Sequence, residues 1–115
     1  MNTITLEDFQ KVEITIGKIL SAEKIPDTDK LLKLSVSFGL ETRQIISGIS
    51  IHFPDPATLV GTKCAFITNL PTRVIKGYES QGMILAISTP PLPNSAGAFS
   101  LFTVPEDIPE GTRAK

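Results

Sequence analysis

Polar and cationic side chains concentrate in residues 69–83, between two apolar runs at residues 64–67 and 83–87. Each run is short enough to be a buried strand. Arg73 and Lys76 lie between them, and a connection held by two rigid strands is a common place for a binding surface. The segment is therefore a candidate for binding rather than for catalysis, and an ordinary solvated connection is the alternative.

Catalytic and metal-binding patterns are missing from the sequence. The chain has 115 residues, which predicts one domain, with a single histidine, His52, and a single cysteine, Cys64. Cys64 cannot form an internal disulfide, and its apolar neighbours predict a small buried side chain. One cysteine and one histidine do not make a structural zinc site. We expect no enzyme activity, no metal and no cofactor.

Charge and hydropathy narrow the class of protein further. Eleven basic and twelve acidic residues give a formal net charge of −1, whereas a generic nucleic-acid-binding protein usually has a strong basic excess. A local basic patch remains compatible with this balance. No run approaches 18 apolar residues, and the N-terminus lacks a basic head followed by an apolar stretch. We therefore predict a cytoplasmic protein without a membrane segment.

Apolar periodicity predicts a β-rich chain. Residues 5–10 form a helical turn in which Leu6 and Phe9 are expected to close one end of the core. Gly17 interrupts the alternation of the first strand, which suggests a bulge or bend that lets one strand serve two sheets. Asp55 is expected to cap a short helix. The expected strands are 11–25, 32–38, 43–51, 63–70 and 83–88, with the short helix at 56–60.

Five strands with a short helix between the third and fourth predict an all-β chain, a five-stranded OB-fold barrel. A proline-rich connection at residues 89–97 precedes a further expected strand at 98–104, so the barrel should carry a C-terminal β extension. This strand crowds four large apolar side chains, Phe99, Leu101, Phe102 and Val104, into seven residues. Left exposed, they would form a patch that soluble monomers avoid, so they predict a homodimer. The alternative is that the segment folds back on its own barrel.

Several blocks of sequence resemble one family in order and spacing. They are DFQKV (8–12), IGKI (16–19), AEK (22–24), DKLLKL (29–34), RQIISGI (43–49) and ESQGM (79–83). They are similar to the tRNA-binding domain that occurs free-standing in bacteria and archaea, and appended to methionyl-tRNA synthetases, the phenylalanyl-tRNA synthetase beta subunit and eukaryotic synthetase cofactors. The resemblance covers residues 8–115. It implies a barrel at about 10–88 and a dimerisation extension at about 89–115.

The resemblance implies non-catalytic binding of tRNA shape and backbone, with an aminoacyl-tRNA synthetase as a possible partner. The resemblance to small free-standing members also implies a homodimer joined by the C-terminal extensions. Carried onto this sequence, the tRNA-binding residues are Lys30, Lys33, Arg43, Asn69, Arg73, Lys76, Ser80 and Met83. Cations would neutralise phosphates, and Asn and Ser would bond backbone or base edges. For Lys33 a merely solvated lysine is the alternative, and for Met83 a core residue at a strand start.

A second branch of the same fold is the alternative function. It resembles CsaA, a dimeric chaperone that binds unfolded peptides and would need an exposed apolar groove. The motifs SQGM and DKLL favour the tRNA branch. Two features depart from it: the net charge is slightly negative, and Tyr78 is the only aromatic residue on the 69–83 connection that could stack on a base.

Overall fold

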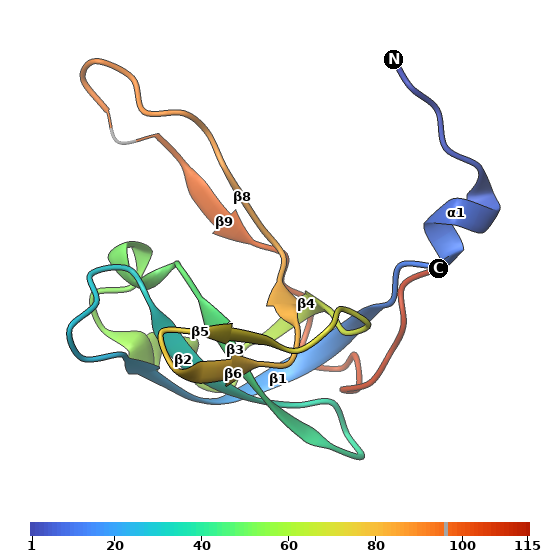
Figure 1. Cartoon of the computed structure of the whole chain (residues 1–115), viewed down its shortest axis with the longest axis horizontal. Coiled ribbons are helices and arrows are strands. Elements are labelled where there is room, and N and C mark those ends of the chain that lie inside the picture. Colours follow the sequence, from blue (N-terminus) through green and yellow to red (C-terminus); the bar gives the residue numbers. More distant parts are fainter. Residues whose placement is uncertain (96) are drawn as a thin grey trace.

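An antiparallel sheet of five strands, in the order β3–β2–β1–β4–β7, forms the centre of the fold (Figure 1). The structure is a computed structural model that describes residues 1–95 and 97–115. The strands of this sheet are β1 (Ile14–Lys24), β2 (Leu32–Ser37), β3 (Thr42–Ser47), β4 (Lys63–Ile67) and β7 (Met83–Ile84). The sheet curls into a half-barrel, which confirms the prediction of an all-β, OB-like fold.

Two hairpins and three short helices complete the described elements. The hairpins are β5 (Arg73–Ile75) with β6 (Tyr78–Ser80), and β8 (Ala86–Ser88) with β9 (Phe99–Leu101). The helices are α1 (Leu6–Gln10) and the 3-10 helices η1 (Ser50–His52) and η2 (Pro56–Leu59). In the described part of the chain, every helix is too short or too polar to cross a membrane.

Strand β2 shows why this sequence forms a barrel wall. Leu32, Leu34 and Val36 are fully buried, and the residues between them lie on the wetter face. This period of two matches the pleat of a strand with one buried face. Burying each such side chain stabilises the fold by about 1.5–3 kcal/mol. Cys64 is also fully buried in the core, and desolvation raises the pKa of its thiol to about 11, so it acts as a small apolar side chain as predicted.

Strand β1 links the two parts of the barrel, as the sequence predicted. Its first half pairs with β4 and its second half with β2. The irregularity lies between Ile19 and Ser21, however, and not at Gly17. A Cβ at Gly17 would lie 2.5 Å from Val36 Cγ1, so this position needs glycine for the close approach of β2.

The C-terminal tail after β9 packs against the barrel. The backbone N–H of Ala65 donates to Phe102 O at 2.9 Å, and that of Ile16 donates to Thr112 O at 2.8 Å. Lys63 is only 8% exposed, and its ammonium donates to the carbonyls of Glu106 and Ile108 at 2.7 and 2.8 Å. The tail therefore covers open edges of β4 and β1.

Three predictions about individual elements need correction. Leu6 and Phe9 of α1 are 70% and 38% exposed, so the expectation that they close the core is wrong. Helix α1 is held instead by its cap, because Asp8 N–H donates to Thr5 Oγ1. The third strand ends at Ser47, and η1 follows within the predicted range 43–51. The predicted single strand at 83–88 is also wrong, because β7 ends at Ile84 in the five-stranded sheet and β8 begins at Ala86 in the hairpin with β9. The short helix is confirmed, with the Asp55 carboxylate accepting from Ala57 N–H at 3.1 Å.

Candidate functional site

The sequence suggested a plain loop between β4 and β7. The structure shows that this connection contains the β5–β6 hairpin. Its turn is the pair Lys76 and Gly77, with φ of 53° and 86°. Positive φ at both central residues is the geometry of a type I′ turn, which matches the twist of short hairpins. The adjacent β-branched residues Val74 and Ile75, followed by the turn residue Gly77, are the signal that could have predicted this hairpin.

The hairpin is fixed against strand β3. Ile46 N–H donates to Ser80 Oγ at 3.0 Å, and Gln44 N–H donates to Gln81 Oε1 at 3.0 Å. Gln81 N–H donates to Gln44 O at 2.8 Å in return. These bonds satisfy the edge of β3 that the five-stranded sheet leaves open, so the hairpin has a defined position on the barrel.

Ser80 belongs to this support and not to an exposed surface. It is 4% exposed, and its hydroxyl both accepts from Ile46 N–H and donates to Gly82 O at 3.0 Å. The sequence placed it among the tRNA-contacting residues because it lies in the SQGM motif. The structure gives it the role of holding β6 against β3.

Arg43 and Asn69 likewise make hydrogen bonds within the protein, although Asn69 is exposed. The Arg43 side chain is 22% exposed, and its guanidinium donates to Thr68 O at 2.6 Å and to Gln81 O at 3.1 Å and pairs with Glu41 at 2.7 Å. The amide of Asn69 accepts from the N–H of Glu13 and donates to the carbonyl of Lys11, at 2.9 and 2.6 Å. Both side chains join segments that are distant in sequence.

The lysines at positions 30 and 76, although 46 residues apart, line one hollow of about 400 Å³. Lys30 belongs to the turn after β1 and Lys76 to the tip of the β5–β6 hairpin. Asp27 and Asp29 line the same hollow. Neither lysine makes a salt bridge within the described residues. Ammonium groups suit phosphates, and carboxylates can accept a hydrogen bond from a ribose hydroxyl.

Lys33 continues this surface onto strand β2. Its ammonium lies 5.6 Å from the centre of the Tyr78 ring and 3.7 Å from Glu23 Oε1. The side chain is 34% exposed, so it is neither buried nor freely solvated. Its contacts place Tyr78 beside the cations, which sequence spacing could not indicate.

Arg73 and Met83 meet at a second, smaller hollow of about 60 Å³. Leu70, Pro71 and Ile75 also line it. Met83 is 44% exposed, so it lies on the surface rather than in the core. Ile75 lines both hollows, which are therefore neighbours on the surface.

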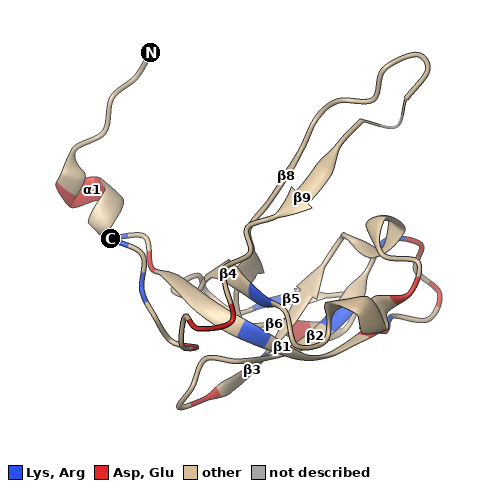
Figure 2. Cartoon of the chain, turned by 180° about the vertical axis from the view of Figure 1, so that it is seen from behind, with Lys and Arg blue, Asp and Glu red and all other residues tan. Residues whose placement is uncertain are grey.

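The charges of the site are mixed rather than uniformly basic. Figure 2 shows lysine and arginine segments alternating with acidic segments over the barrel, while the β8–β9 hairpin is uncharged. Among the described residues, no three His, Cys, Asp or Glu side chains gather where they could hold a metal ion. The arrangement offers cations, hydrogen-bond acceptors and an apolar surface, which together suit a polyanion that carries planar bases.

Comparison with known families shows which family the chain belongs to. Residues 14–113 match the family described as "Putative tRNA binding domain". The chain belongs to this tRNA-binding domain family. The resemblance seen in the sequence is thereby confirmed, and the function of the domain is tRNA binding.

Members of the tRNA-binding domain family include long enzymes. Residues of this chain are 47% identical over 112 positions to a methionine–tRNA ligase of Methanoregula boonei, and 41% identical over 110 positions to one of Caldanaerobacter subterraneus subsp. tengcongensis. These matches cover 97% and 96% of this chain but 16% of each ligase. The chain therefore corresponds to one sixth of the length of these relatives.

Solved structures agree with the barrel of this tRNA-binding domain. A MetRS-related protein from Pyrococcus horikoshii superposes with a TM-score of 0.90 at 38% identity, covering 100% of both chains. The chaperone CsaA of Bacillus anthracis superposes with a TM-score of 0.80 at 23% identity, covering 99% of this chain and 100% of that one. The second likeness shows a shared fold.

Proposed function

We propose that this chain binds tRNA without catalysing a reaction, through the face formed by Lys30, Lys33, Arg73, Lys76 and Met83. The observation that supports this most is the meeting of cations from the β1–β2 turn and the β5–β6 hairpin at one hollow. These two loops and strand β2 border the face that OB folds use for oligonucleotides. The cations would contact phosphates and so recognise backbone and shape rather than sequence.

Arg43, Asn69 and Ser80 have supporting roles in this proposal. They hold the hairpin, the end of β4 and the N-terminal segment in place through the bonds described above. The domain comprises residues 8–115, with RNA contacted by the barrel at about 10–88. The cytoplasm is the compartment that fits a tRNA ligand. An aminoacyl-tRNA synthetase is the proposed partner, because methionine–tRNA ligases carry the same domain.

Replacement of single cations tests the proposed face. Arg73→Ala and Lys76→Gly are each expected to weaken tRNA binding about threefold to tenfold, measured by fluorescence anisotropy of labelled tRNA at low salt, because each removes one phosphate contact. Lys76→Gly also relieves a left-handed backbone that costs an L-residue about 1 kcal/mol, so its melting temperature should not fall.

Lys115→Ala is the matched control, since it removes a charge from the C-terminus, away from the hairpin (Figure 1). Equal weakening by all three variants would show a diffuse charge effect and no defined face. Binding of a reduced, unfolded polypeptide in preference to tRNA would favour a chaperone function instead.

The β8–β9 hairpin supports a homodimer as a second part of the proposal. It projects from the barrel (Figure 1), and residues 86–101 contain no charged side chain. Ile87 and Leu92 are 57% and 66% exposed, and Phe102, next to the hairpin, is 46% exposed. Such an uncharged arm with exposed apolar side chains favours contact with another protein surface.

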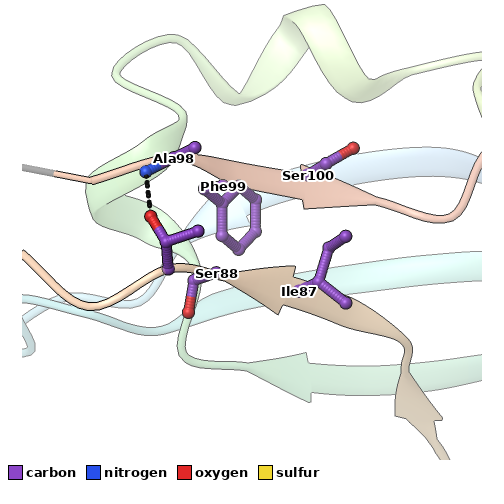
Figure 3. A pocket seen from close by; sticks show the side chains of 6 residues that line it. Ile87, Ser88, Ala98, Phe99 and Ser100 are labelled. Carbon is purple, nitrogen blue, oxygen red and sulfur yellow. Dashed lines mark hydrogen bonds between the residues drawn. The ribbon is translucent and has the colours of Figure 1, made fainter.

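A hollow in the β8–β9 hairpin also supports the proposed homodimer. Ile87, Ala98 and Phe99 line an apolar space of about 150 Å³ (Figure 3), and Ala98 N–H donates to Oγ1 of Thr89, which lines the same space. Part of the predicted interface does fold back: Phe99 and Leu101 pack partly on the core of their own barrel. The proposed interface is therefore formed by Leu92 and Phe102 of the extension at residues 89–115, together with Ile87 just before it.

We expect the wild-type chain to sediment as a dimer at micromolar concentration and Ile87→Asp to sediment as a monomer, because a carboxylate would be buried unpaired in the interface. Leu40→Asp is the control, since Leu40 is fully exposed in the β2–β3 turn. A monomeric wild type, or monomers from both variants, would contradict the dimer. Truncation at Pro93 is a poor test because it removes the partners of Lys63 and β4.

A further inference from the structure

The small hollow beside Met83 is a slot rather than an open surface. Its volume of about 60 Å³ is about twice the share of one water molecule in liquid water. Leu70 and Pro71 approach it from the segment after β4, and Met83 from the start of β7. Leu70 and Met83 are 43% and 44% exposed. The slot can therefore receive the face or edge of a flat group, but not a large ligand as a whole.

The polarity of the slot limits what that group can be. Arg73 is charged, and the described residues that line the slot include no acidic side chain. Ser80 lies at its floor, but its hydrogen is already donated to Gly82 O. A ligand with an apolar planar part and an adjacent anion matches these walls, and a nucleotide has that composition.

The neighbouring hollow extends the match. Ile75 lines both the slot and the hollow that Lys30 and Lys76 line. An RNA strand crossing Ile75 could place one base in the slot and a phosphate on each side. A base within a regular helix is stacked and paired, so its face cannot enter such a slot, whereas a base in a loop or at an end can.

We infer that the slot of Leu70, Pro71 and Met83 holds one unpaired nucleotide of the bound RNA, with Arg73 at its phosphate. This inference rests on the proposed tRNA-binding face and specifies which element of the RNA that face selects. Because the Ser80 hydroxyl already donates to Gly82 O and accepts from Ile46 N–H, it is not available to read a base edge, and the slot accepts any base. The protein thereby selects folded RNA with exposed loops over plain duplex.

Two RNA probes test the inference in the full-length chain. One is a short unstructured RNA with a single 2-aminopurine, and the other is a blunt duplex of the same length. The wild type should bind the unpaired RNA more tightly and change the 2-aminopurine fluorescence. Met83→Ala should weaken binding of the unpaired RNA about fivefold, since about 1 kcal/mol of apolar contact is lost, and leave duplex binding unchanged.

Val74→Ala is the matched control, because Val74 lies between Arg73 and Ile75 on the same strand, is 68% exposed and does not line the slot. It should bind both probes like the wild type. If Met83→Ala weakens both probes equally or neither, the slot inference is wrong while the tRNA-binding face stands. If the wild type binds neither probe nor tRNA, the proposed function itself is wrong. Displacement of 2-aminopurine RNA by an unfolded polypeptide would assign the slot to a protein segment.

Discussion

A rise in salt from 50 to 200 mM is expected to weaken tRNA binding by about 20- to 40-fold. The estimate takes one phosphate for each of Lys30, Arg73 and Lys76, with a slope of about −0.7 to −0.9 per contact in a plot of log affinity against log salt. Lys33 is left out because it already pairs with Glu23 and lies over Tyr78. Anisotropy titrations at several salt concentrations measure the slope.

The triple variant Lys30→Ala, Arg73→Ala and Lys76→Gly separates this face from the rest of the protein. For this variant the slope of log affinity against log salt should fall close to zero, because the side chains that displace counterions from the tRNA are absent. A slope that the triple variant leaves unchanged would place the phosphate contacts elsewhere. The net charge of −1 makes this test sensitive, since little background attraction is expected.

Arg43→Ala should destabilise the fold by about 2–4 kcal/mol and lower the melting temperature by about 8–16 °C. The guanidinium donates to carbonyls of Thr68 and Gln81, so its loss leaves two acceptors without this donor and loosens the hairpin. Thermal unfolding monitored by circular dichroism measures this loss of stability.

Arg73→Ala is the comparison for this prediction. Arg73 is exposed on the hairpin, and surface changes of this kind alter stability by only about 0.5 kcal/mol. The two arginines should therefore show opposite profiles: Arg43 affects stability most, and Arg73 affects RNA binding most. If Arg43→Ala melts like the wild type yet loses tRNA binding, Arg43 contacts RNA directly and the role assigned here is wrong.

The sequence by itself determined the fold class and the family. Alternation in β2, the Asp55 cap and the single buried cysteine depend on local periodicity and composition, which a sequence displays directly. It also marked residues 69–83 as a candidate binding segment. Spacing along the chain could not separate the residues of that segment by role, because exposure depends on what folds against each side chain.

The tertiary structure decided which of those side chains are bonded within the protein. Ser80 Oγ accepts from Ile46 N–H of β3, and Arg43 donates to the carbonyls of Thr68 and Gln81. The tertiary structure brought Lys30 to Lys76 across 46 residues, which no local pattern encodes. It also used the C-terminal tail to cover β1 and β4, with Lys63 buried beneath it. These are long-range contacts, and their partners are chosen by the closure of the barrel rather than by sequence neighbours.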